Sequence, residues 1–189
     1  MIGYAICGSF CTFSQALLAL EGLVKDGYEI QPIMSERAYS FDTRFWLASE
    51  FRERVESLCG RKIIHSIVDA EPLGPKNPLD SLIIAPCTGN TLAKMAHGIT
   101  DSTVTMAAKA HLRQDRPLLI ALCTNDGLSQ NLANIAGLLT RKSVYFVPMR
   151  QDDPKGKPHS LVADLTLLPE AFCAAQKSEQ LRPLFLPPK

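Results

Sequence analysis

Short apolar runs recur along the chain and alternate with segments of helical periodicity. Most of the runs are continuous, which is typical of parallel strands that are covered on both faces. The predicted strands are residues 2–7, 29–34, 62–68, 81–85, 118–123 and 143–148. The alternation of strand and helix indicates that crossover helices join the strands.

The segments between the strands repeat apolar residues on one helical stripe. Residues 13–26 and 43–59 are predicted helices, and each ends before a glycine, Gly27 or Gly60, that favours a helix stop. Further helices are predicted at residues 90–97, 101–113, 128–140 and 161–177. Residues 69–80 are rich in proline and are predicted to form a surface loop without a crossover helix.

These elements predict an α/β fold, a single-domain doubly wound parallel sheet of the Rossmann or flavodoxin type. About six strands are expected, in the order 3-2-1-4-5-6 with right-handed crossovers. We expect the domain to span residues 1–180 and a Pro-rich tail to follow at residues 181–189.

Composition narrows the class of protein. The chain has 189 residues, 20 Lys and Arg against 19 Asp and Glu, and 21% charged residues, which excludes a disordered or collagen-like chain and argues against duplex DNA as a partner. No apolar run approaches the roughly 20 residues that cross a bilayer. The first residues lack a leader pattern, and the six cysteines form no C-x-x-C pair, so we expect a cytoplasmic protein without a zinc site.

Two loops carry the candidate chemistry. They comprise residues 8–12 after the first strand and 86–91 after the fourth, and both lead into a helix. Because neighbouring parallel strands end at one edge of the sheet, both loops are expected to face one crevice. A helix start presents free N–H groups and attracts an anion. The alternative is structural, because Thr12 with Gln15 forms a capping-box pattern and Asn90 or Thr91 suits an N-cap.

The anion is narrowed by the motifs that are missing. The sequence has no G-x-G-x-x-G after the first strand, no G-x-x-x-x-G-K-[ST] and no G-x-S-x-G. A short loop rich in hydroxyl groups instead suits a single phosphate monoester, such as that of FMN.

Gly8-Ser9 and the run at 85–96 resemble the FMN-binding flavoprotein family, which includes peptidyl-cysteine and phosphopantothenoylcysteine decarboxylases. The run is similar to that family's P-A-S/T-A-N-T motif, with Cys87 and Gly89 in place of the usual small residues. Motifs at 8–12, 43–45, 70–76, 100–102, 106–110, 124–126 and 151–154 look like the dipicolinate synthase branch of this family, across nearly the whole chain.

The resemblance implies FMN as cofactor, a homo-oligomer and a partner chain similar to the other dipicolinate synthase subunit, which has its own dinucleotide-binding fold. Together the subunits of a sporulating bacterium, in the mother-cell cytoplasm, would oxidise a (hydroxy)tetrahydro- or dihydrodipicolinate to pyridine-2,6-dicarboxylate. The electron acceptor stays open between FMN, NAD(P) on the partner and oxygen. The alternatives are a non-catalytic partner subunit with a vestigial crevice and an FMN-dependent decarboxylase of another carboxylate.

The resemblance also assigns residues. The candidates for cofactor binding are Gly8, Ser9, Phe10, Cys11, Thr12, Ser35, Pro86, Cys87, Thr88, Gly89, Asn90, Thr91, Thr124 and Asn125. Of these, Gly8, Ser9, Thr12 and Ser35 are expected around the phosphate; Pro86, Thr88, Asn90 and Thr91 along the flavin or a subunit contact; and Thr124 and Asn125 along the ribityl chain or ring.

A dicarboxylate substrate requires cations. Arg44 and Lys109 are the candidates, and a solvated helix end or an exposed basic face is the alternative for each. No catalytic residue can be assigned. The decarboxylases carry a P-x-M-N-x-x-M clamp over the substrate, and residues 148–151 are the nearest piece of it here.

Overall fold

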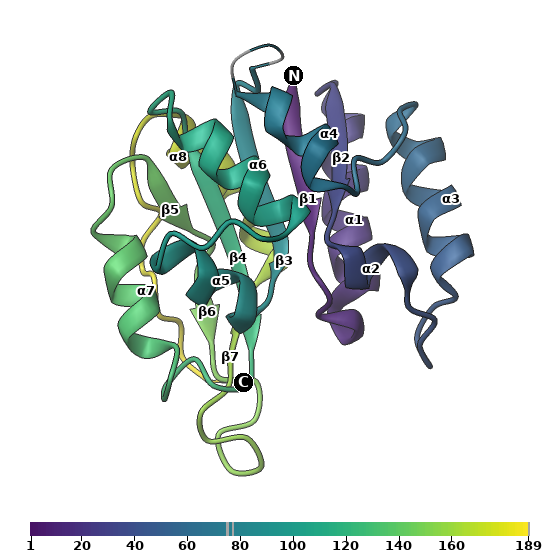
Figure 1. The fold of residues 1–189 in the computed structure, drawn as a ribbon. Coiled ribbons are helices and arrows are strands. Elements are labelled where there is room, and N and C mark those ends of the chain that lie inside the picture. Colours follow the sequence, from purple (N-terminus) through teal and green to yellow (C-terminus); the bar gives the residue numbers. More distant parts are fainter. Residues whose placement is uncertain (75, 77, 189) are drawn as a thin grey trace.

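A sheet of seven strands forms the centre of the molecule, with helices on both faces (Figure 1). The computed structural model describes residues 1–74, 76 and 78–188. The strands are β1 (Ile2–Ile6), β2 (Ile30–Met34), β3 (Ser81–Cys87), β4 (Leu118–Thr124), β5 (Val144–Phe146), β6 (Met149–Arg150) and β7 (Leu161–Ala163). The helices are α1 (Phe13–Lys25), α2 (Glu36–Ser40), α3 (Ala48–Cys59), α4 (Ile67–Ala70), α5 (Gly89–Ala96), α6 (Thr103–Leu112), α7 (Leu132–Leu139) and α8 (Leu168–Gln176).

The strand order is β2-β1-β3-β4-β7-β6, and β5 also pairs with β4. The pairs formed by β1 to β5 are parallel, whereas β7 is antiparallel to both β4 and β6. An isolated parallel bridge between Ile33 and Ile64 adds the third predicted segment beside β2. The predicted doubly wound fold and its order 3-2-1-4-5-6 are therefore confirmed for the six predicted segments, and the short strands β6 and β7 are additional.

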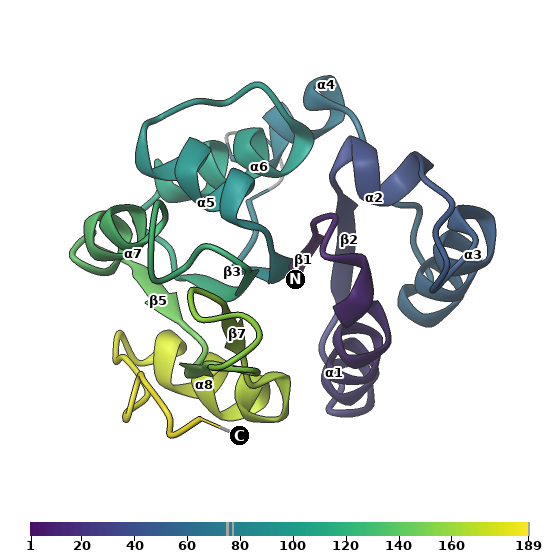
Figure 2. The same ribbon diagram turned by 90° about the horizontal axis from the view of Figure 1, so that it is seen from below.

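Two layers of buried side chains flank the sheet. Helices α1, α3 and α8 pack on one face around Tyr4 and Phe51, and helices α5, α6 and α7 pack on the other around Leu92 and Ile135. Figure 2 shows the two groups of helices on opposite sides of the strands. The continuous apolar runs of β1, β3 and β4 are buried throughout, apart from the half-buried Thr124, as strands covered on both faces must be.

Helix ends follow the predicted signals in two places. Helix α1 is followed by Gly27 at φ +85°, and α3 is capped by Gly60 at φ +61°, a region that favours glycine. Helix α3 begins five residues later than the predicted start at 43. The reason is that the carboxylate of Asp42 accepts from the N–H of Ala48 at 2.8 Å and sets the start of the helix.

Three predicted segments are wrong in part. The strand at 62–68 shrinks to a bridge at Ile64, because Ser66 accepts from the N–H of Asp69 at 3.1 Å and starts α4. The predicted loop at 69–80 therefore begins in α4 and continues as a 3₁₀ helix, Glu71–Leu73; its positions 75 and 77 lie outside the described residues. The helix at 161–177 contains β7, a 3₁₀ helix (Leu165–Leu167) and α8 instead.

The segment after α8 packs along the edge of the sheet. The N–H of Met149 donates to the carbonyl of Leu184 at 2.9 Å, and the N–H of Leu186 donates back to Met149 at 2.8 Å. Leu184 is buried in the core. Residue 189 of the predicted tail lies outside the described residues.

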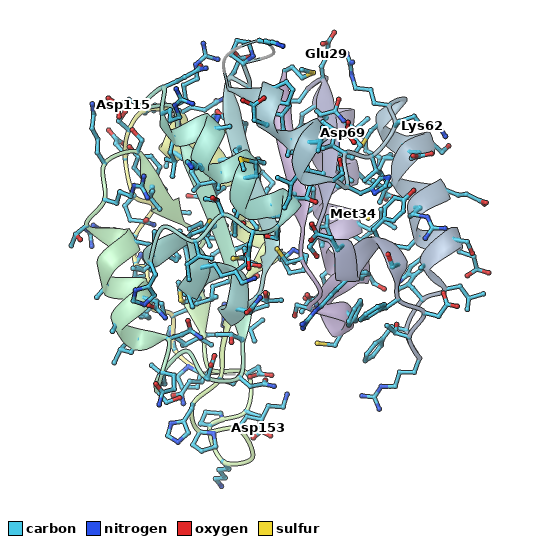
Figure 3. The ribbon with its side chains drawn as sticks, viewed as in Figure 1. Glu29, Met34, Lys62, Asp69, Asp115 and Asp153 are labelled. Atoms are coloured by element: carbon cyan, nitrogen blue, oxygen red, sulfur yellow. The ribbon has the colours of Figure 1, made fainter. Side chains whose placement is uncertain are left out.

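The carboxyl ends of the parallel strands gather at one end of the molecule. Figure 3 places Asp153, in the loop between β6 and β7, at the lower end and Glu29 and Asp115 at the opposite end. This loop therefore joins the loops that follow β1, β3 and β4 at the carboxyl edge, where ligands of open α/β sheets bind.

Candidate functional site

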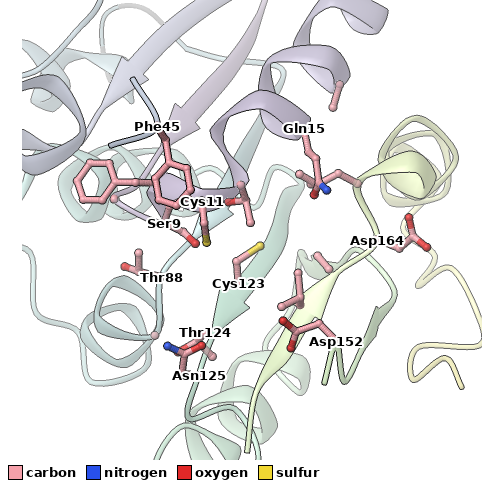
Figure 4. A pocket seen from close by; sticks show the side chains of 18 of the residues that line it. Ser9, Cys11, Gln15, Phe45, Thr88, Cys123, Thr124, Asn125, Asp152 and Asp164 are labelled. Carbon is pink, nitrogen blue, oxygen red and sulfur yellow. Dashed lines mark hydrogen bonds between the residues drawn. The ribbon is translucent and has the colours of Figure 1, made fainter. Parts of the chain in front are cut away.

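A cleft of about 1050 Å³ opens at the carboxyl edge of the sheet (Figure 4). Three parts of the chain line it: the loop at 8–12 with the start of α1, the starts of α5 and of the segment after β4, and the β6–β7 region with residues 164–166. This volume lies at the upper end of the roughly 300–1,000 Å³ usual for small-molecule sites. The cleft is large enough for a nucleotide-sized cofactor together with a small ligand.

The two predicted loops lie side by side, as expected. Strands β1 and β3 are parallel neighbours, and the N–H of Cys7 donates to the carbonyl of Pro86 at 3.0 Å. The hydroxyl of Thr91 donates to the Cys7 sulfur at 3.3 Å across 84 positions of sequence. Segments that are distant in the chain thus form one wall of the cleft.

The start of α1 lacks a side-chain cap. The hydroxyl of Thr12 donates to the carbonyl of Ser9 at 2.8 Å, and neither Ser9 nor Thr12 accepts from an N–H group of the helical turns. The capping-box interpretation of Thr12 and Gln15 is therefore wrong. An uncapped helix start that lines a cleft leaves N–H groups available to an anionic ligand.

The start of α5 is capped, but by a different residue from those predicted. Thr88 accepts from the N–H of Thr91 at 3.3 Å, so neither Asn90 nor Thr91 is the N-cap. Asn90 is exposed and lines the cleft. Its side chain is available to a ligand because the capping role falls to Thr88.

A hydrogen-bonded cluster under α5 fixes the position of this helix. Asp126 accepts from the hydroxyl of Thr124 and, at 2.9 Å, from the amide of Asn131. A side chain at Gly89 would place its Cβ 2.5 Å from both the Thr124 hydroxyl and the Asn131 amide nitrogen. Only glycine allows the first turn of α5 to approach the end of β4 this closely.

The third wall carries paired charges. Arg150 on β6 pairs with Asp164 at 2.5 Å, and Lys157 pairs with Asp152 at 2.9 Å. With Arg44, whose guanidinium lies 4.8 Å from the centre of the Phe45 ring, the cleft holds three cations and two anions. The lining has an excess of one positive charge and suits an anionic ligand.

Burial decides the protonation of several groups here. It raises the pKa of the Cys123 thiol to about 12 and that of Cys87 well above the usual value, so both remain neutral thiols. Burial also raises the pKa of Asp164, but hydrogen bonds from Thr166 and the charge of Arg150 outweigh it and hold this pKa below its usual value. Asp164 is therefore a carboxylate at neutral pH.

Most of the predicted site residues line the cleft. Those that do are Gly8, Ser9, Phe10, Cys11, Thr12, Arg44, Thr88, Gly89, Asn90, Thr124 and Asn125. Those that do not are Ser35, Pro86, Cys87, Thr91 and Lys109.

Each of these five exceptions has a structural reason. Ser35 caps α2 by accepting from the N–H of Ala38 at 3.3 Å. Pro86 and Cys87 continue β3 and are buried, and Thr91 is buried against Cys7. Lys109 is exposed on α6, a helix that packs against α4 and does not reach the cleft.

Sequence reasoning missed the third wall. Arg150, Asp152, Lys157, Asp164 and Thr166 line the cleft, yet none was among the candidates. The available signal was the density of charged residues after 148, beside the nearest piece of the clamp motif. It was hidden because residues 161–163 were assigned to a helix and not to a strand that pairs with β4.

The described part of the chain has neither a metal-binding cluster nor a membrane-spanning helix. No group of three or more His, Cys, Asp or Glu side chains there is arranged to hold a metal ion. Among the helices of that part, none combines the length and the apolar character that a bilayer crossing requires.

Known proteins resemble this chain in sequence and in structure. The family model described as "Flavoprotein" matches residues 1–163. One of the dipicolinate synthase subunits of Bacillus subtilis (strain 168) is 43% identical over 185 residues, 98% of this chain and 92% of the relative. The crystal structure of the corresponding dipicolinate synthase subunit from Bacillus halodurans C has a TM-score of 0.90 and 40% identity, and the match covers 98% of this chain and 95% of that one.

A more distant structure shares the fold. AnUbiX (PadA1), solved in complex with FMN and dimethylallyl pyrophosphate, has a TM-score of 0.63 and 22% identity, with 78% of this chain and 76% of that chain covered. The family match covers both predicted loops and reaches the end of β7, the last strand of the sheet. The chain belongs to the flavoprotein family.

Proposed function

We propose that this chain binds FMN in the cleft at the carboxyl edge of its sheet. The observation that carries the proposal is the uncapped start of α1, beside a loop of small and hydroxyl-bearing residues. There the N–H groups and the Ser9 hydroxyl are suited to a phosphate dianion. The family and a structurally similar protein solved with FMN support the same cofactor.

The remaining cleft residues suit the rest of the cofactor. Thr88, Asn90 and Asn125 offer polar side chains along one side, and the neutral, buried thiol of Cys123 lies between the polar walls. In this proposal these residues orient the flavin and limit its contact with water. When bound, FMN supplies a ring that accepts a hydride.

We further propose that the chain acts with a second subunit in forming pyridine-2,6-dicarboxylate by two-electron oxidation, in the mother cell of a sporulating bacterium. The support is the 43% identity to a protein named as one subunit of dipicolinate synthase from a Bacillus. The positive balance of the cleft suits a substrate with two carboxylates. A homo-oligomer is also part of this proposal.

The cofactor is tested by titrating the purified chain with FMN while flavin fluorescence and the visible spectrum are recorded. We expect quenching and a shifted spectrum. Ser9→Ala is expected to weaken binding by about tenfold or more, because it removes a hydrogen bond to a charged group. Ser49→Ala, an exposed serine on α3 outside the cleft, is the matched control. Unchanged fluorescence at high protein concentration would refute FMN binding.

A mixing experiment separates a flavin-dependent subunit from a non-catalytic partner. Each subunit is assayed alone and mixed for formation of pyridine-2,6-dicarboxylate. If the cleft serves the reaction, the double variant Ser9→Ala, Asn90→Ala lowers the activity of the mixture. Full activity of that mixture would leave only the partner role, and release of carbon dioxide would favour the decarboxylase.

A further inference from the structure

One row of paired residues crosses three strands on the cleft side of the sheet. Cys123 on β4 pairs with Val162 on β7, and Val162 pairs with Arg150 on β6. All three line the cleft. With strands about 4.8 Å apart, Arg150 lies roughly 10 Å from Cys123 along this row. The row ends in a positive charge after two apolar positions.

Arg150 differs from the other cations of the cleft in how it is held. Its side chain is 22% exposed, whereas that of Lys157 is 52% exposed and Arg44 is an exposed residue. Its partner Asp164 is fixed in turn, because the N–H and the hydroxyl of Thr166 both donate to the other carboxylate oxygen, at 3.2 and 2.6 Å. The guanidinium is thus oriented before any ligand arrives.

The guanidinium also has unused hydrogen-bonding capacity. It has five N–H donors, and Asp164 accepts through the Nη2 nitrogen. The buried Nε has no acceptor among the described residues. A half-satisfied guanidinium at the end of a cleft is suited to a carboxylate, which it can bind with two parallel hydrogen bonds.

The position of this pair separates it from the phosphate end of the cleft. Figure 4 shows Asp152 and Asp164 on one side and Ser9 and Thr88 on the other, with Cys123 between them. A ligand anion at Arg150 therefore does not compete for the start of α1. The cleft has two anion-binding ends joined by an apolar floor.

We propose that Arg150 binds a carboxylate of a small dicarboxylate substrate and that Asp164 is the positioning residue for its guanidinium. This inference rests on the proposed function, since the phosphate end is assigned to FMN. It names a residue for substrate recognition in the region where the decarboxylase clamp is absent.

The test is calorimetric titration of the FMN-loaded full chain with pyridine-2,6-dicarboxylate and with the uncharged pyridine-2,6-dicarboxamide. We expect the chain to bind the dicarboxylate and to bind the diamide at least tenfold more weakly. Arg150→Gln is expected to weaken dicarboxylate binding by about 10- to 100-fold, and Arg150→Lys by less, because the charge remains but the fork is lost. FMN affinity is expected to stay within twofold.

Two controls isolate the role of Arg150. Arg116→Gln removes an arginine that also pairs with an aspartate, Asp80, outside the cleft, and should change neither affinity. The double variant Arg150→Gln, Asp164→Asn removes both charges of the pair. If dicarboxylate affinity stays low in it, the loss comes from the missing cation; a return to the wild-type value would show that an unpaired Asp164 had repelled the ligand and would overturn the inference.

The other outcomes are equally decisive. Unchanged dicarboxylate binding in Arg150→Gln, absence of binding to the wild-type chain, or an equal loss of FMN affinity would each overturn the role of Arg150. If the wild-type chain binds no FMN, the proposed cofactor fails by itself. The same dicarboxylate titrations without FMN then still show whether Arg150 is required.

Discussion

At the scale of single residues, Gly89 determines how closely α5 approaches the end of β4. Its missing side chain is replaced by the hydrogen-bonded group of Thr124, Asp126 and Asn131. These side chains are short and already bonded to one another, so they cannot move away cheaply. The cleft residues of both segments, Asn90 and Asn125 among them, therefore take their positions from this contact.

Gly89→Ala is expected to lower the free energy of unfolding by about 1–3 kcal/mol through overpacking. FMN affinity should fall as well, because the start of α5 is displaced. Gly137→Ala is the matched control: this glycine lies within α7, nothing lies within 4 Å of its added Cβ, and alanine should stabilise the helix by about 0.5–1 kcal/mol. Urea unfolding measures both, and equal stability of Gly89→Ala and wild type would contradict the packing argument.

At the scale of elements, helix α1 is attached to the sheet through Tyr4. This residue is fully buried in β1, and its hydroxyl donates to the carbonyl of Ala16 at 2.8 Å. Because α1 begins at the cleft, the contact orients the helix whose free N–H groups we assign to phosphate. Burial also raises the pKa of Tyr4 far above its usual value, so the hydroxyl stays a donor.

Tyr4→Phe is expected to lower the free energy of unfolding by about 1 kcal/mol, the usual net contribution of one hydrogen bond. Tyr145→Phe serves as the control, since that half-buried hydroxyl makes no hydrogen bond to any residue that the structure describes. Chemical denaturation followed by circular dichroism gives both values. A loss no larger in Tyr4→Phe than in Tyr145→Phe would show that the contact with Ala16 contributes little.

At the scale of the whole molecule, one buried histidine couples folding to pH. His111 is buried at the end of α6, and a ring nitrogen lies 2.9 Å from the carbonyl of Pro117. Burial lowers its pKa below the usual value, although the Pro117 carbonyl acts in the opposite direction. In the unfolded chain the same ring titrates near about 6.5.

The sign follows from proton binding. Below pH of about 6.5 the unfolded chain takes up a proton that the folded chain refuses, so stability falls as pH is lowered from 7.5 toward 5. Thermal unfolding should therefore begin at lower temperature at pH 5 than at pH 7.5. His111→Gln should reduce this difference, while His159→Gln, an exposed histidine in the loop before β7, should leave it unchanged. A pH dependence identical in all three chains would exclude His111 as its source.

The sequence allowed the parallel part of the fold to be predicted, because β1, β3 and β4 are continuous apolar runs whose burial is decided locally. It also brought the loops at 8–12 and 86–91 together, since neighbouring parallel strands end at one edge. The wall that carries Arg150 was not predicted. Strands of two and three residues have no periodicity to read, and their pairing with β4 is a tertiary contact.

The antiparallel direction of β6 and β7 has a further consequence. The phosphate-facing loops and the wall with Arg150 belong to different stretches of sequence and meet only across the row from Cys123 to Val162. Exchange of residues 149–166 would thus alter what lies opposite the cofactor while the parallel scaffold keeps its own contacts. In such an architecture a new substrate preference can arise from one short hairpin.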